Sequence, residues 1–319
     1  MKAVVAVSGS LAFDRIFDYP GRFRDAINPK KLHLLNVSFM VRSVKESYGG
    51  TAGNIGYSLA LLGAKPMVIG SVGNDFGRYR GWLSRHGVGC SQVLVRRSMT
   101  TASAYIITDK DDNQISVFHS GALSSGISAT GGTLRQALRS VHYAIIAPDD
   151  PVSMVRMSAR CRTAGVPYLF DPGQQLTSVT REQLRKMLVH ADGVVSNDYE
   201  LSLLLDRSGM SLTALRATVR YVVTTLGAKG SIVHHGRTSY RIPPVRPKSI
   251  IDPTGAGDAY RAGFVRGLLA TGSFSIAGRM GSLASAYTVE RHGTQTHEYS
   301  VTRFIRRYRS SFSTPLSLT

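Results

Sequence analysis

The sequence has 319 residues, of which 43 % are hydrophobic and 32 are glycine, and its formal net charge is +19 at pH 7. A chain of this length can bury a substantial core in one large α/β domain or in two domains. No apolar run approaches the roughly 18 residues that span a bilayer, so the composition argues against a membrane protein and predicts a soluble globular one.

The positive charge would attract polyanions in a salt-dependent way. The arginines are nevertheless scattered, with their densest group in "RFIRRYR" at 303–309, and no zinc finger, basic zipper or RNP-type sequence accompanies them. We therefore expect no specific nucleic-acid partner and no membrane partner. The two cysteines, Cys90 and Cys161, lack metal-ligand spacing and fit a reduced, cytoplasmic setting best.

Short apolar runs alternate with segments of helical spacing along the chain. The first run, at 3–9, is too short for a signal peptide and lacks a cleavage pattern, so we interpret it as a buried strand. Further strands are predicted at 66–73, 143–147, 167–171, 193–197 and 221–227. Helices are predicted at 53–63, 76–87, 154–165 and 180–191. This repeated order predicts an α/β fold with a parallel sheet covered by helices.

Two regions interrupt this order. Residues 15–48 and 99–120 alternate polar and apolar side chains as strands do, and "DKDDNQ" at 109–114 has the composition of a hairpin turn. We expect these regions to form a small β-rich lid over the sheet edge where ligands of α/β folds bind. No internal repeat or interdomain linker is visible, so residues 1–319 are expected to form one domain that carries this lid.

The segment "IIDPTGAGDAYRAGF" at 250–264 runs from a glycine-rich loop into an apolar helix. Gly255, Ala256 and Gly257 would leave backbone N–H groups bare at a helix start, which favours an anion such as phosphate. The charge of Asp258 would repel that anion, so an acid at this position indicates that it has a task beside the bound anion. Phosphoryl transfer needs this combination of a phosphate nest and a base near the attacking hydroxyl. The sequence contains no GxxxxGK[ST] loop and no GxGxxG fingerprint after a strand, so a nucleotide must be held in another way.

Four motifs resemble the ribokinase-like (PfkB) family of carbohydrate and nucleoside kinases. Long signatures at 48–88 and 252–264 stand in the family's order, while "NDYE" at 197–200 and "TTLGAKG" at 224–230 match its Asn-x-x-Glu motif and its nucleotide loop. The resemblance implies a three-layer α/β/α fold with a mainly parallel central sheet and a small β-sheet lid. It also implies transfer of the γ-phosphate of ATP to an alcohol group, with Mg²⁺ as cofactor.

The resemblance assigns roles on the nucleotide side. Asp258 corresponds to the base that takes the proton of the acceptor hydroxyl, and the backbone of Gly255, Ala256 and Gly257 corresponds to the anion hole. Asn197 and Glu200 would order Mg²⁺ through water, or alternatively form a helix capping box. The residues expected to line ATP are Asn197, Thr225, Gly227 and Gly230.

The acceptor side rests on a second group of residues, which resemble those that bind vicinal sugar hydroxyls in the family: Ser10, Asp14, Gly49, Gly50 and Asn54. Glycine permits close approach, and a carboxylate accepts two hydroxyl protons. Alternatively, Asp14 caps a turn and Asn54 caps the helix at 53–63.

The segments around Phe118 and Pro253, together with "GTQ" at 293–295, look most like the bacterial-type adenosine kinases. Phe118 would stack on a base, or alternatively pack within the lid. Ala104 stands where that branch would carry a second aromatic clamp, and strand alternation places Tyr105 on the opposite face. The resemblance therefore implies a purine-salvage kinase of the nucleoside 5′-hydroxyl, with adenosine as first acceptor and a broader range open.

Two other functions stay open. A kinase of ribose or another free sugar would share every catalytic residue. A non-catalytic nucleic-acid-binding protein would account for the +19 charge, but not for an intact Asp258. The sequence leaves a K⁺ requirement and the oligomeric state undecided, although the lid of this family can serve as a homodimer interface.

Overall fold

The computed structural model describes residues 2–34, 36–126 and 132–318. Within them, a nine-stranded sheet has the order β13-β12-β11-β10-β9-β8-β1-β4-β5. The strands from β11 to β5 in this order run parallel, whereas β12 is antiparallel to β11 and β13 is antiparallel to β12. Their bounds are β1 Val4–Ser8, β4 Lys65–Gly73, β5 Gly89–Arg96, β8 Tyr143–Ile146, β9 Tyr168–Phe170, β10 Gly193–Asn197, β11 Tyr221–Thr225, β12 Ser231–His235 and β13 Thr238–Ile242.

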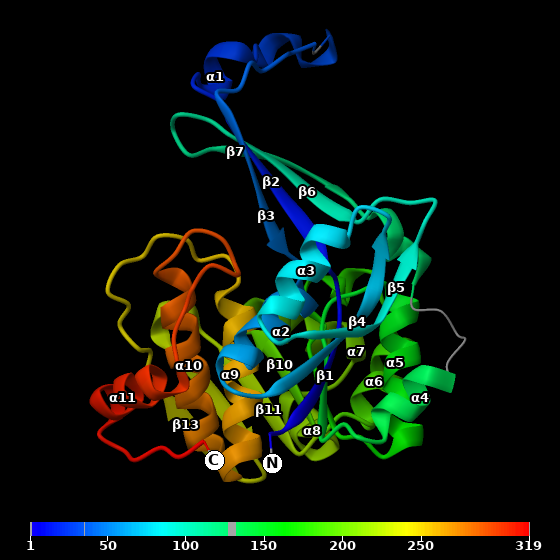
Figure 1. Ribbon diagram of the computed structural model, residues 1–319, viewed down its shortest axis with the longest axis vertical. Coiled ribbons are helices and arrows are strands. Elements are labelled where there is room, and N and C mark those ends of the chain that lie inside the picture. Colours follow the sequence, from blue (N-terminus) through cyan, green and yellow to red (C-terminus); the bar gives the residue numbers. More distant parts are fainter. Residues whose placement is uncertain (1, 35, 127–131, 319) are drawn as a thin grey trace.

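Helices cover both faces of this sheet (Figure 1). One layer comprises α2 Thr51–Leu61, α3 Gly77–Arg85, α9 Ala256–Thr271 and α10 Phe274–Val289, and α11 Val301–Phe312 packs outside it. The other layer comprises α4 Gly132–Leu138, α5 Pro151–Ala164, α6 Arg181–Val189, α7 Asp198–Ser208 and α8 Leu212–Thr218. None of the helices in the described ranges is long and apolar enough to cross a membrane.

Strand β1 illustrates why the sheet lies between two layers. Val5 and Val7 belong to the core cluster on one face, Ala6 belongs to the cluster on the other, and all three are fully buried. Successive side chains of a strand point to opposite faces, so a continuous apolar run requires cover on both. The three-layer α/β/α fold expected from the sequence is confirmed.

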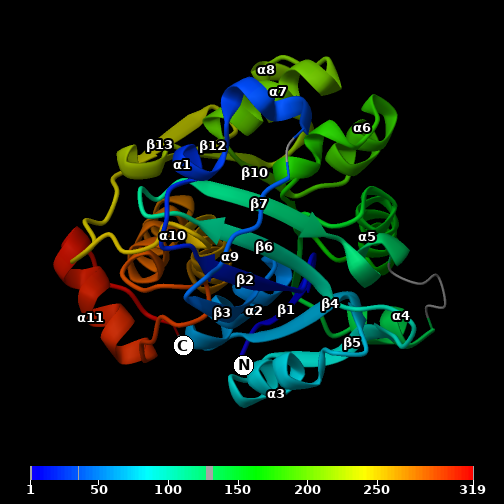
Figure 2. The same cartoon turned by 90° about the horizontal axis from the view of Figure 1, so that it is seen from above.

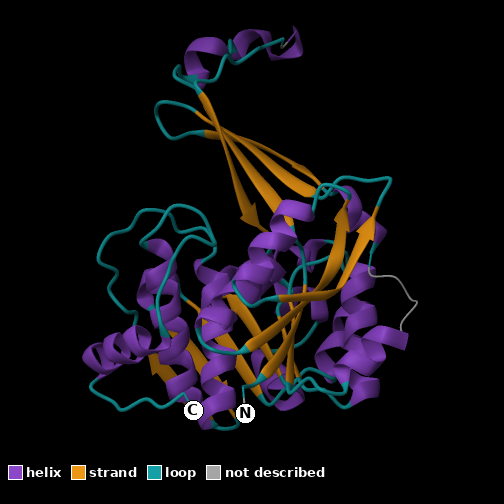
Figure 3. Cartoon of the chain, in the orientation of Figure 1, coloured by secondary structure: helices purple, strands orange, loops and turns teal. Residues whose placement is uncertain are grey.

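A second, four-stranded sheet projects from the carboxyl edge of the large one (Figures 1 and 3). We call it the lid sheet, and seen from above its strands cross over the core (Figure 2). Its order is β3-β2-β6-β7, with β2 parallel to β6 and the other pairs antiparallel. The bounds are β2 Ala12–Asp18, β3 Ser43–Gly49, β6 Ala102–Thr108 and β7 Gln114–His119.

The lid differs in detail from the expectation of two strand-like regions at 15–48 and 99–120. Strand β2 begins earlier, at Ala12, and the middle of the first region holds α1 Phe23–Ala26 and a 3-10 turn at Pro29–Leu34, while residue 35 lies outside the described residues. An aromatic cluster of Tyr19, Phe23 and Phe39 forms beside α1, with ring centroids 4.9 to 5.8 Å apart. This cluster, rather than further strand pairing, organises the tip of the lid.

The expected turn in the second region is present. Asp109 closes the β6–β7 hairpin, because its Oδ1 accepts from the backbone N–H groups of Asp111 and Asn113 at 2.9 Å. Three strands of the core were not predicted: β5, β12 and β13. Each mixes polar and apolar side chains, as edge and near-edge strands do when one face meets solvent.

Candidate active site

Asp258 lies in the first turn of α9, directly after the glycine-rich loop. Gly255 is the residue before the helix and adopts a left-handed conformation with φ 78°, which side chains with a Cβ rarely adopt. Asp252 fixes the start of the loop, since its two oxygens accept from the backbone N–H groups of Thr254 and Gly293, each at 2.9 Å. The structure therefore brings Gly255, Ala256, Gly257 and Asp258 together at one helix N-terminus, where an anion is favoured.

A chain of hydrogen bonds joins Asp258 to the lid sheet. Asn54 Nδ2 donates to Asp258 Oδ2 at 2.8 Å, and Gln295 Nε2 donates to Asn54 Oδ1 at 3.0 Å and to the Tyr79 hydroxyl at 2.6 Å. Tyr79 in turn donates to the Gly49 carbonyl oxygen at 2.8 Å, at the end of β3. We call this the Asp258–Gly49 chain. Asn54 is the fourth residue of α2, which begins at Thr51, so the alternative that it caps a helix is wrong.

Two carboxylates at the site are poised to titrate in the same range. Burial raises the pKa of Asp258 to about 6, and the charges of Asp171 and Asp14 add to the rise, whereas Arg261 and the Asn54 hydrogen bond oppose it. Burial, reinforced by the charge of Asp252, also raises the pKa of Asp14 to about 6. Perturbed pKa values of this kind are common where groups work on a ligand.

Asp14 lies on β2 of the lid and faces the end of β3. None of the described residues donates a hydrogen bond to its carboxylate, so the structure offers no support for the alternative that Asp14 caps a turn. Gly49 leaves room for it, because a Cβ at this position would overlap Asp14 Oδ2. Gly50 has φ 84°, and a Cβ there would lie 2.6 Å from the Ser10 carbonyl oxygen.

Ser10 serves the joint between core and lid. Its hydroxyl accepts from the backbone N–H of Thr51 at 3.0 Å, and its carbonyl oxygen accepts from Ala52 at 3.0 Å. These bonds hold the N-terminus of α2 against the segment between β1 and β2. Ser10 is buried, so in this structure it positions the site rather than lining an open surface.

The lid presents a row of side chains on the face that carries Asp14. In the register of the sheet, Asp14 on β2 pairs with Ala104 on β6, and Ala104 pairs with Phe118 on β7. Phe118 is 57 % exposed, so it does not pack into a core of the lid. Tyr105 lies on the opposite face, as expected, where its hydroxyl accepts from Arg15 Nη1 at 2.8 Å.

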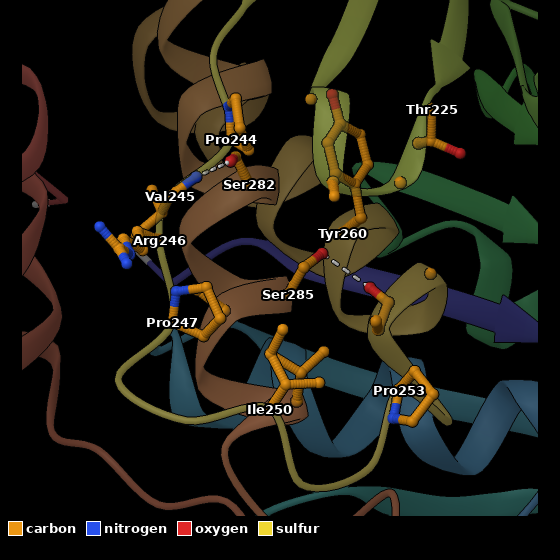
Figure 4. A pocket seen from close by; sticks show the side chains of 17 residues that line it. Thr225, Pro244, Val245, Arg246, Pro247, Ile250, Pro253, Tyr260, Ser282 and Ser285 are labelled. Carbon is orange, nitrogen blue, oxygen red and sulfur yellow. Dashed lines mark hydrogen bonds between the residues drawn. The ribbon is translucent and has the colours of Figure 1, made fainter.

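A cavity of about 610 Å³ adjoins the first turn of α9. Thr225, Gly227, Gly230, Ala256 and Gly257 line it, whereas Asn197 and Gly255, also expected on the nucleotide side, are not among its lining residues. Figure 4 shows the rest of its wall, which includes Tyr260 on α9, Ser282 and Ser285 on α10 and the proline-rich segment 244–247. Ser285 donates to the Ala256 carbonyl oxygen at 2.7 Å, which ties α10 to the loop that would hold phosphate.

Asn197 and Glu200 form the helix capping box that was the alternative interpretation of "NDYE". Glu200 donates its backbone N–H to Asn197 Oδ1 at 2.7 Å, and Asn197 donates its own to Glu200 Oε2 at 2.8 Å. The box leaves Glu200 Oε1 without a hydrogen bond from any described residue. The pair lies at the carboxyl end of β10, the strand next to Thr225 on β11.

Several residues of the site were not predicted from the sequence. Asp171 and Arg261 form an ion pair behind Asp258, and Gln295 and Tyr79 complete the Asp258–Gly49 chain. Gln295 belongs to the "GTQ" segment singled out by the sequence, although no role was attached to it. The cavity wall at 244–247 stands out in the sequence only as "PPVRP".

Comparison with known proteins settles the family. Residues 14–300 match the pfkB family carbohydrate kinases. The chain belongs to this family. It is therefore a phosphotransferase that acts on an alcohol group, with the ribokinase-like fold.

Several proteins that are similar to this chain are nucleoside kinases. The nucleoside kinase of Methanothermobacter thermautotrophicus is 31 % identical over 276 residues, which cover 86 % of this chain and 88 % of that one. The structure of Burkholderia thailandensis nucleoside kinase in complex with inosine is 34 % identical, with a TM-score of 0.85 and coverage of 98 % and 99 %. The same protein in complex with ADP-inosine gives a TM-score of 0.84. Methanocaldococcus jannaschii nucleoside kinase is 25 % identical at a TM-score of 0.84 and covers 96 % of this chain.

Proposed function

We propose that this family member is an ATP- and Mg²⁺-dependent kinase of the nucleoside 5′-hydroxyl, acting on a purine nucleoside such as adenosine or inosine. The observation that carries the proposal is the row of Asp14, Ala104 and Phe118 on one face of the lid. A carboxylate suits the ribose hydroxyls, and an exposed aromatic ring beyond it suits a base. The kinship with nucleoside kinases, one of them bound to inosine, supports the same acceptor class.

In this proposal Asp258 is the general base, and the backbone of Gly255, Ala256 and Gly257 holds the transferred phosphate. The cavity lined by Thr225, Gly227 and Gly230 holds the rest of the nucleotide. The described residues contain no group of three or more His, Cys, Asp or Glu side chains that could hold a metal alone. This fits Mg²⁺, which usually keeps several waters and binds through one or two carboxylates and the phosphates. We propose Glu200, with Asn197, as the acid that orders Mg²⁺.

The domain organisation follows the same proposal. Residues 1–319 form one kinase domain, in which the lid sheet closes over the acceptor. Free thiols at Cys90 and Cys161 support a cytoplasmic location. The lid face opposite Asp14 carries Val44 and Val117, 55 % and 63 % exposed, and a second copy of the lid is the partner we propose for it.

The test is ADP release from MgATP across adenosine, inosine, other nucleosides, ribose and free hexoses. Nucleoside turnover with little sugar turnover supports the proposal and ranks the bases. Turnover with sugars alone would keep the chemistry and contradict the role of Phe118. Oligonucleotide binding at physiological salt without turnover would instead favour a binding protein.

Gly49→Ala is expected to weaken acceptor binding selectively. The added Cβ would overlap Asp14 Oδ2 and lie 2.9 Å from its Cγ, so the carboxylate must rotate away from the ribose hydroxyls. We expect kcat/KM for the nucleoside to fall about 10- to 100-fold, with ADP binding unchanged in calorimetry. Gly77→Ala is the matched control, because a Cβ there meets no atom within 4 Å. Equal kcat/KM values for the two variants would contradict the placement of Asp14.

Activity is expected to fall on the acid side of pH 6. Asp258 and Asp14 both have a pKa of about 6, and each must be a carboxylate to accept a proton or a hydrogen bond from the acceptor. The logarithm of kcat/KM should therefore fall below pH 6 with a slope approaching two. Asp14→Asn should reduce that slope to one. An acid limb centred near pH 4 would contradict the raised values.

A further inference from the structure

A buried ion pair lies behind the first turn of α9 and has no task in the proposed function so far. Arg261 of α9 donates from Nε and Nη2 to the two carboxylate oxygens of Asp171, the residue after β9, with Nη2 to Oδ1 at 2.8 Å. The side chains keep only 9 % and 2 % of their surface accessible. Burying two charges costs more free energy than packing apolar side chains of similar size, so the pair calls for a reason beyond stability.

The third guanidinium nitrogen points to that reason. Nη1 of Arg261 donates to none of the described residues. It lies over Gly257, where an added Cβ would be 2.7 Å from Nη1. Gly257 lines the cavity beside α9 and is one of the residues expected to hold phosphate. Asp171 thus occupies one edge of the guanidinium and leaves an N–H donor against the phosphate-binding turn.

The carboxylates around Arg261 keep its guanidinium charged. Burial alone would lower the pKa of Arg261, but the charge and hydrogen bonds of Asp171, with the charges of Asp258 and Glu200, raise it. The guanidinium therefore stays protonated. Two of the carboxylates that act on it are the proposed base, Asp258, and Glu200, the acid proposed to order Mg²⁺.

We propose that Arg261 is a catalytic residue that donates Nη1–H to the transferred phosphate, and that Asp171 is the positioning residue that holds its guanidinium in place. The proposal deepens the proposed function and rests on it. In the step, the 5′-oxygen forms a bond to the γ-phosphorus while its proton passes to Asp258. The bond from the γ-phosphorus to the β,γ-bridging oxygen breaks, and its electron pair leaves with ADP. Arg261 keeps its proton and neutralises charge on the phosphoryl oxygens.

The decisive variant is Arg261→Gln combined with Asp171→Asn, which removes both charges together and leaves neither buried alone. Without any acceptor, calorimetry compares the Mg²⁺ complexes of ADP and of the β,γ-imido analogue of ATP. We expect the double variant to lose affinity for the analogue about tenfold or more relative to ADP. Because only the analogue carries a γ-phosphate, a purely structural role would move both affinities alike.

Kinetics adds a second readout. The double variant should lower kcat about 100- to 1000-fold, the usual effect of a donor to developing charge, with a much smaller change in acceptor KM. The acid limb of kcat/KM should also move to higher pH, because the charge of Arg261 lowers the pKa of Asp258 by more than the charge of Asp171 raises it. If the double variant does not fold, Arg261→Lys serves instead: it keeps the charge but cannot bridge Asp171 and also reach Gly257.

Arg266→Gln is the matched control. Arg266 lies five residues further along α9, is also buried, and among the described residues donates only to the carbonyl oxygens of Leu62 and Leu318. Arg266→Gln should lower the thermal midpoint and leave the ratio of the affinities for the analogue and for ADP unchanged. An unchanged ratio in the double variant would overturn the proposal. A ratio that depends on Arg261 in a protein that phosphorylates no nucleoside would overturn the proposed acceptor and leave the phosphate contact standing.

Discussion

Asp258→Asn is expected to abolish most turnover while making the protein more stable at neutral pH. Asparagine keeps an oxygen that can accept from Asn54 Nδ2, the bond that measures 2.8 Å in the native protein, but it cannot take the proton of the acceptor. Loss of a general base typically lowers turnover by about two to four orders of magnitude. ADP release and ADP binding, measured on the same preparation, separate this loss from a loss of nucleotide.

The gain in stability follows from the sign of the pKa shift. Burial raises the pKa of Asp258 from 3.8 to about 6, so the folded protein binds this proton more tightly than the unfolded chain. As the pH rises from about 4 to 6, the ionised carboxylate becomes a cost to folding, and above 6 that cost is complete. Asparagine removes this cost, which we expect to add up to about 3 kcal/mol to the free energy of unfolding at pH 7.5 and to raise the thermal midpoint by roughly 5 °C. The gain should vanish near pH 4.

Asp206→Asn is the control for both measurements. Asp206 is exposed on α7, and its carboxylate makes no hydrogen bond or ion pair with the described residues. Neither turnover nor the thermal midpoint should change. An Asp258→Asn protein that keeps a tenth or more of native turnover would remove Asp258 from the role of base.

Gly50→Ala is expected to destabilise the protein by about 3 kcal/mol or more, and it can prevent folding at 37 °C. Gly50 has φ 84° and ψ 141°, a region open almost only to glycine, where another residue costs about 1 to 3 kcal/mol. A Cβ would also meet backbone atoms of Ser10, Leu11 and Ala12, all within 2.8 Å. These backbone atoms, where the chain passes from β1 into β2, cannot move aside as the end of a flexible side chain can. Urea unfolding, followed by fluorescence, measures the loss.

Gly165→Ala separates the two causes. Gly165 ends α5 with φ 67°, yet a Cβ there meets no atom within 4 Å, so only the conformational cost of about 1 kcal/mol applies. The difference between the two variants then gives the steric part. Equal losses in the free energy of unfolding would show that the close approach of Gly50 to the segment at 10–12 adds nothing to the cost of a Cβ at Gly50.

The sequence was informative where function depends on consecutive residues. The loop "GAGD" places the nest and Asp258 in one helical turn, so the composition alone indicates an anion site with an acid inside it. The buried strands were predictable because β1, β8 and β10 are apolar on both faces. The mixed strands β12 and β13 were not, since the register of β12 with β11 and of β13 with β12 decides which side chains are covered.

Residues that act through long-range partners were out of reach. In the sequence, Arg261 does not differ from the many other arginines. Its role depends on Asp171, 90 positions earlier, which binds one edge of its guanidinium. Asn54 was expected to contact the acceptor, but its amide bonds both Asp258 and Gln295, and Gln295 is 241 positions away from it. Only the packing of α2 against α9 brings these groups together.

In the proposed function, the Asp258–Gly49 chain links the sites of two substrates that bind to different parts of the molecule. One end is the carboxylate beside the phosphate loop, and the other is the carbonyl oxygen at the end of lid strand β3. In the proposed function, an acceptor held by Asp14 on β2 fixes the neighbouring strand β3 and so the orientation of the base, and such an effect is reciprocal in free energy. A lone water molecule cannot fix the strand. We therefore expect little ATP hydrolysis without a nucleoside, because the proposed base is then not held in the orientation that transfer needs.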